Sequence, residues 1–196
     1  MSPAIFETAK TAFSLLLTGA AIKLMDDFVD AAPGERWGGE RSALPYALLF
    51  FAGGAALNSS LTVSLFLAAY ALGMAYDYAE KMPSGLLGYQ ESLLVVALGI
   101  VVLGWSEIAG SLLIIASIQL LDDVRDQQED RYSGQKNLAR RWGRVEAGLL
   151  AAITFLATLL LAPVKAVATL AASLLVTALF ARSVPPETER WMDYDF

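Results

Sequence analysis

The apolar residues of this chain are gathered into long runs, and the charged residues stand between them. The longest run extends from Ser42 to Tyr76 without any Asp, Glu, Lys or Arg. An uncharged apolar stretch of about 18 residues is typical of one membrane span. This run is long enough for two, divided at Asn58, Ser59 and Ser60. Over the whole chain the pattern predicts about seven helical spans, at roughly 11–30, 43–57, 61–76, 92–105, 108–121, 147–162 and 166–181. We therefore expect an all-α fold, a multi-pass transmembrane bundle around a central cavity.

The basic residues fall mostly on one side of such a bundle. If the spans alternate in direction, every Lys and Arg except Lys10 and Lys165 lies on or near the side where the first span ends. An excess of Lys and Arg marks the cytoplasmic side of a membrane protein. We therefore expect an integral, multi-pass protein of the cytoplasmic membrane, with one helical domain over residues 1–196 and a short cytoplasmic tail at 183–196.

Composition narrows the chemistry that the chain can perform. Hydrophobic residues make up 56% of it, and it contains no Cys and no His. Disulfides, thiolate or imidazole metal ligands and a histidine general base are therefore excluded. Any metal ion must be bound by oxygen ligands. The net charge of −6 argues against nucleic acid as a partner.

Two acidic clusters end the first and the fifth predicted spans, each with the pattern DDxxD. The first cluster consists of Asp26, Asp27 and Asp30, and the second of Asp122, Asp123, Asp126 and Asp130. Side chains three or four residues apart share one helix face, so Asp123, Asp126 and Asp130 are expected to project together and repel one another. A divalent cation relieves this repulsion, and oxygen-only ligation suits magnesium. Because both helices run in the same direction, the two clusters could face one cavity and clamp a diphosphate through metal ions.

The stretch DDVRDQQEDRYSGQKNLARRWG resembles the second signature of the UbiA-type intramembrane prenyltransferases. That signature reads N/D-D-x-x-D-x-x-x-D, followed by a Gly, a basic residue, Thr-Leu and a closing Gly. The positions in register are Asp122, Asp123, Asp126, Asp130, Gly134, Lys136, Leu138 and Gly143, and Asn137 stands where Thr is usual. The first cluster is similar to the family's first signature, with Asp26 in place of Asn and Gly34 in place of the third Asp. The resemblance covers roughly residues 15–162, and the seven spans look like the second to eighth of the nine helices usual in the family.

What the resemblance implies is magnesium-dependent transfer of an isoprenyl group from a prenyl diphosphate to a lipophilic, often aromatic acceptor in the membrane. All seven clustered aspartates would contribute to magnesium binding, and the direct catalytic roles would fall to Asp27, Asp30, Asp123, Asp126 and Asp130. The remaining charge of the diphosphate would be neutralised by Lys81, Lys136, Arg140 and Arg141. Tyr76 and Tyr78, in a segment similar to the family's tyrosine-and-lysine segment, could stabilise an allylic cation through their rings, by roughly 0.5–2 kcal/mol.

Other interpretations stay open at this point. A membrane terpene cyclase would use the same clusters without an acceptor, and a transporter or a non-catalytic scaffold would not need them for chemistry. A CDP-alcohol phosphotransferase needs a D-G-x-x-A-R segment that the chain lacks. Lys23 lies three and four residues before Asp26 and Asp27, so the first cluster could simply form ion pairs. The basic loop could contact anionic lipid, and Tyr76 and Tyr78 could belong to an interfacial aromatic belt.

Overall fold

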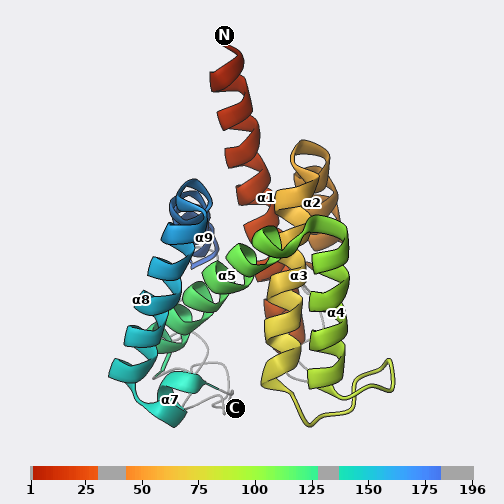
Figure 1. Ribbon diagram of the computed structural model, residues 1–196, viewed down its shortest axis with the longest axis vertical. Coiled ribbons are helices and arrows are strands. Elements are labelled where there is room, and N and C mark those ends of the chain that lie inside the picture. Colours follow the sequence, from red (N-terminus) through yellow and green to blue (C-terminus); the bar gives the residue numbers. More distant parts are fainter. Residues whose placement is uncertain (1, 31–42, 128–136, 182–196) are drawn as a thin grey trace, which may run out of the picture.

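The computed structural model describes residues 2–30, 43–127 and 137–181, without the side chains of residues 29, 30 and 181. Within these ranges the chain forms eight helices and no strand, as Figure 1 shows. The helices are α1 (Pro3–Asp30), α2 (Ala43–Leu57), α3 (Ser59–Tyr76), α4 (Gly88–Leu103), α5 (Trp105–Arg125), α7 (Leu138–Trp142), α8 (Arg144–Leu161) and α9 (Pro163–Ala181). The predicted all-α fold is confirmed.

Four of the described helices, α1, α3, α8 and α9, are long and apolar enough to span a membrane, and α2 and α4 are shorter apolar helices. Large apolar side chains such as Val101, Leu160 and Val164 are exposed on the outside. An apolar outer surface is what a helix needs in lipid, whereas a helix on a water-soluble protein carries charges on its outer face. The described part of the chain therefore has the features of a membrane protein.

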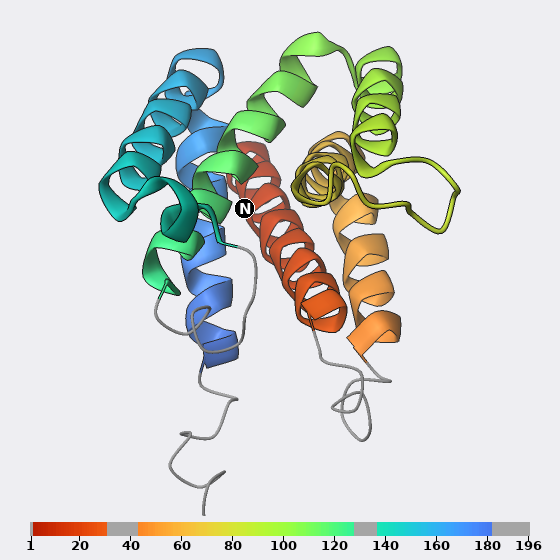
Figure 2. The ribbon, with the colours of Figure 1, turned by 90° about the horizontal axis from the view of Figure 1, so that it is seen from below.

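Four helices form the inside of the bundle. Helices α3 and α9 each contact both α1 and α5, and the remaining long helices pack outside, with α2 on α1, α4 on α3 and α8 on α5. In Figure 2 α1 lies between α9 and α3. The main buried cluster contains residues from all four inner helices: Leu15, Leu61, Leu65, Ala68, Ile114, Ile115 and Ala172.

The four inner helices run in the same direction. At one end of the bundle, the Lys165 ammonium contacts the Glu107 carboxylate, which joins the start of α9 to the start of α5. At the other end, the Tyr76 hydroxyl donates a hydrogen bond to Asp123, which joins the end of α3 to the end of α5. We call this second end the acidic end. The α3–α4 loop and α7 lie there too (Figure 1), so the basic residues Lys81, Arg125, Arg140, Arg141 and Arg144 lie at the same end of the bundle as the acidic ones.

Small and hydroxyl-bearing residues allow α1, α2 and α3 to approach closely. A Cβ atom on Gly54 of α2 would lie 3.0 Å from Thr18 Oγ1 and 3.3 Å from the Ser14 carbonyl oxygen. The Ser14 hydroxyl lies 3.0 Å from Thr62 Oγ1 of α3 and donates to the Gly54 carbonyl oxygen at 3.1 Å. Packing through small residues and interhelical hydrogen bonds is the usual way in which helices associate in lipid.

Candidate functional site

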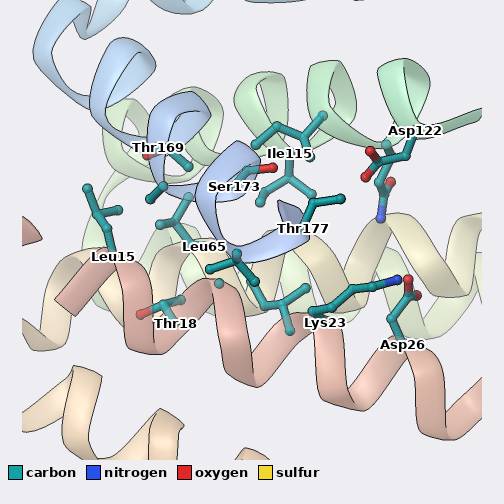
Figure 3. A pocket seen from close by; sticks show the side chains of 16 residues that line it. Leu15, Thr18, Lys23, Asp26, Leu65, Ile115, Asp122, Thr169, Ser173 and Thr177 are labelled. Carbon is teal, nitrogen blue, oxygen red and sulfur yellow. The ribbon is translucent and has the colours of Figure 1, made fainter. Parts of the chain in front are cut away.

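A small cavity lies among α1, α3, α5 and α9 and extends toward the acidic end. Its volume is about 100 Å³. Its polar end is lined by Lys23 and Asp26 of α1 and by Gln119 and Asp122 of α5. Figure 3 shows Lys23 and Asp26 across from Asp122, while Leu15 lies at the opposite end of the view. We call it the acidic-end cavity.

The cavity brings the two acidic clusters together through their first residues. Asp26 belongs to the first cluster and Asp122 to the second, and both line the same space. Asp27 instead lies 2.8 Å from the Lys23 ammonium, measured from Oδ1 to Nζ. This is the ion pair that the four-residue spacing of Lys23 and Asp27 had left open, and it places a positive charge beside the two facing carboxylates.

Asp123 has structural contacts. Its Oδ2 accepts one hydrogen bond from the Tyr76 hydroxyl at 2.7 Å and another from the Leu138 backbone N–H at 2.9 Å. Its backbone carbonyl accepts a bond from Asn137 Nδ2 at 2.7 Å. Asn137 also caps α7, because its Oδ1 accepts a bond from the Arg140 backbone N–H at 3.0 Å. Asp123 therefore ties the ends of α3 and α5 to the start of α7.

The remaining candidates are distributed around the acidic end. Asp126 caps α5, with its backbone N–H on the Asp122 carbonyl oxygen at 2.8 Å and its Oδ1 3.9 Å from Arg125 Nε. Four of the predicted site residues are exposed and do not line the cavity: Tyr78, Lys81, Arg140 and Arg141. Three candidates lie outside what the structure describes: Asp130, Lys136 and the Asp30 side chain.

Whether magnesium fits this site depends on how many carboxylates the structure brings together. Among the described residues, no three acidic side chains come close enough together to form a metal site. Asp26 and Asp122 nevertheless supply two carboxylates to one cavity. Magnesium in phosphate-binding sites is commonly held by one or two carboxylates, with the substrate's phosphates and water completing its coordination. The described pair fits a magnesium ion that arrives with a phosphorylated substrate.

The cavity also contains residues that the sequence interpretation did not include. Helix α9 contributes hydroxyls at a four-residue spacing, from Thr169, Ser173 and Thr177. Thr169 is only 6% exposed, and its Oγ1 has no hydrogen-bond partner among the described residues. The signal was present in the sequence, because a repeat of hydroxyls every four residues in an apolar span marks one helix face.

Replacing Tyr76 by Phe is expected to lower the free energy of unfolding by about 1.5 kcal/mol, since it removes a hydrogen bond to a carboxylate while keeping the ring. The measurement is the midpoint of thermal unfolding in detergent. Tyr78→Phe is the matched control, because Tyr78 is exposed in the α3–α4 loop. Equal midpoints for Tyr76→Phe and the wild type would show that the bond to Asp123 contributes nothing to stability.

Comparison of the chain with protein families, with curated proteins and with solved structures finds no match. The function must therefore be inferred from the sequence motifs and from the geometry of the acidic-end cavity.

Proposed function

We propose that this protein is a UbiA-type intramembrane prenyltransferase, which transfers an isoprenyl group from a prenyl diphosphate to a lipophilic, aromatic acceptor. In this proposal the seven long helices form a compact version of the family's bundle, and the acidic end faces the cytoplasm. The observation that carries the proposal is that Asp26 and Asp122, each the first residue of a DDxxD pattern, line one cavity among apolar helices.

The described residues supply what such a reaction needs at the diphosphate. Asp26 and Asp122 would hold magnesium against the diphosphate oxygens. Magnesium, when bound, offsets the negative charge that develops on the leaving diphosphate. Lys23 adds a positive charge at the same place, and Arg140 and Arg141 lie at the same end of the bundle. Arginine forks suit phosphate oxygens.

The apolar wall of the cavity supports the second half of the reaction. When the bond between C1 and the diphosphate oxygen breaks, the allylic carbon becomes electron-deficient, and water would capture it. Ile22, Ile115 and Ile118 line the cavity and exclude water. The acceptor's nucleophilic atom then forms the new bond to C1, and the proton that it loses passes to the released diphosphate.

The test is an incubation of the purified protein with magnesium, prenyl diphosphates of five to twenty carbons and a panel of aromatic acceptors, read by mass spectrometry. The expected result is a prenylated acceptor that disappears when EDTA is added. Cyclised hydrocarbon formed without an acceptor would identify a terpene cyclase instead. If no donor is consumed, and a non-hydrolysable prenyl diphosphonate gives no magnesium-dependent rise in melting temperature, the proposal is wrong.

A further inference from the structure

Lys23 is the basic residue of the acidic-end cavity. Of the described residues that line this cavity, it alone is a Lys or an Arg. Lys23 belongs to neither DDxxD pattern. Arg140 and Arg141 are exposed and do not line the cavity. Among the described cations, Lys23 is therefore the one best placed to meet a diphosphate at Asp26 and Asp122.

The Lys23 ammonium lies beside two neighbouring carboxylates. Lys23 is three residues before Asp26 and four before Asp27, so both aspartates lie about one turn further along the same side of α1. Its Nζ is 2.8 Å from Asp27 Oδ1. Asp26 lines the cavity, whereas Asp27 does not. In Figure 3 the Lys23 side chain extends along α1 toward Asp26, and Asp122 faces them from α5. The ammonium therefore lies at the border between its ion pair and the cavity.

The ion pair between Lys23 and Asp27 is partly open to solvent. The two side chains are 39% and 48% exposed, and an ion pair with that exposure contributes little to stability. A lysine side chain has a flexible stem, and its ammonium donors rotate freely. The ammonium can therefore leave Asp27 at low cost and donate a hydrogen bond to an anion inside the cavity.

A positive charge at this place opposes the binding of a metal ion to the empty site. The ammonium and a divalent cation are attracted to the same carboxylates, and they repel each other. Among the described residues, only Asp26 and Asp122 offer carboxylates to the cavity. A diphosphate changes this balance, because it has several negative charges and can bind the ammonium and a metal ion together. The site is therefore expected to bind metal weakly until a diphosphate is present.

We propose that Lys23 binds the diphosphate of the donor, and that in the empty site it pairs with Asp27 and opposes metal binding. This inference rests on the proposed function. When the diphosphate enters, the ammonium moves from Asp27 to a phosphate oxygen, and the Asp27 carboxylate becomes available as an oxygen ligand. The consequence is that the metal ion and the donor bind together.

The test is the substitution Lys23→Met, which removes the charge and keeps an unbranched side chain. The first measurement is the dissociation constant of Mn²⁺ alone, from the electron paramagnetic resonance of the free ion. The second is the dissociation constant of a non-hydrolysable prenyl diphosphonate at saturating Mn²⁺, by calorimetry, with the chain length that binds the wild type most tightly. We expect Lys23→Met to bind Mn²⁺ about tenfold more tightly than the wild type. We expect it to bind the diphosphonate at least about tenfold more weakly.

The matched control is Lys10→Met, the same substitution on the same helix, which changes the net charge by the same amount. Lys10 lies near the start of α1 and forms a 3.7 Å ion pair with Glu7. Both dissociation constants of Lys10→Met are expected to equal those of the wild type. Lys23→Arg keeps the charge and should stay closer to the wild type than Lys23→Met in both measurements. Lys23→Gln removes the same charge and replaces Lys23→Met if that variant does not fold.

The opposite signs of the two changes separate this role from a structural one, because a loss of local structure would weaken both kinds of binding. If Lys23→Met binds the diphosphonate as tightly as the wild type does, or binds Mn²⁺ no more tightly, the inference about Lys23 is wrong and the proposed function stands. If no prenyl diphosphonate of five to twenty carbons binds any of these proteins, the proposed function has failed as well.

Discussion

Replacing Asp122 by Asn is expected to lower the magnesium-dependent turnover of a prenyl diphosphate by about a thousandfold while the protein stays folded. Asp122 lines the acidic-end cavity opposite Asp26. An amide cannot offer a charged oxygen to magnesium. The loss of metal-assisted departure of the diphosphate costs about 4 kcal/mol in the transition state, which is close to three powers of ten in rate. Asp26→Asn is expected to behave in the same way.

The experiment measures turnover across a magnesium titration, together with the melting temperature of each variant. Glu7→Gln is the matched control, since Glu7 lies on α1 at the far end of the bundle and pairs with Lys10 at 3.7 Å. It should keep the wild-type rate. Asp123 is less suitable for this test. It forms hydrogen bonds with Tyr76 and Leu138, so its replacement could lower the rate by disturbing the structure. Retention of more than about a tenth of the wild-type turnover by Asp122→Asn would remove this carboxylate from the mechanism.

The long helices could be located from the sequence because an apolar run of sufficient length has few alternatives to a helix in lipid. Residues 43–57 were predicted as one span, and α2 has those bounds. The start of α1 shows the limit of this reasoning. The span was predicted from residue 11, whereas α1 begins at Pro3 and includes the ion pair between Glu7 and Lys10. Hydropathy marks the stretch that lipid would cover, and a helix can continue beyond it into water.

The short helix α7 was not predicted. It has five residues and lies in what the sequence shows only as a basic loop. Its start depends on the Asn137 cap, and its end on Gly143, whose φ of 116° ends the helix. Such a helix has no apolar run to reveal it. It is held by packing of Ala139 against Leu120 and Ala147, which lie on α5 and α8.

The details of the acidic site depend on where α5 ends and on which side chains compete for its carboxylates. The three- and four-residue spacing predicted that Asp123, Asp126 and Asp130 project together; α5 ends at Arg125 with Asp126 as its cap, and Asp130 lies outside the described residues. Asp123 is engaged by Tyr76, which lies far away in the sequence. Asp26 and Asp122, expected to act with the other aspartates as magnesium ligands, are the two that meet in the cavity. A motif gives residue types and spacing, and the tertiary contacts decide which members face the site.

Replacing Lys165 by Met is expected to lower the free energy of unfolding by about 3 kcal/mol, the largest stability effect that the described contacts predict. The Lys165 ammonium lies 2.7 Å from Glu107 Oε1, and the two side chains are only 10% and 32% exposed. It also donates to the Glu107 backbone carbonyl at 3.2 Å and to Ser64 Oγ at 3.3 Å. Loss of the cation leaves a carboxylate without its counter-charge among apolar helices. That penalty exceeds the net value of the pair itself.

A double substitution tests this reason directly. Lys165→Met combined with Glu107→Gln removes both charges, so it should be more stable than Lys165→Met alone, although it lacks two native groups instead of one. Lys10→Met serves as the control, because its exposed pair with Glu7 should be worth less than about 1 kcal/mol. The measurement is the unfolding midpoint in detergent for the wild type, Lys165→Met, the double variant and Lys10→Met. If the double variant is no more stable than Lys165→Met, the loss comes from packing around the lysine stem and not from the unpaired Glu107 carboxylate.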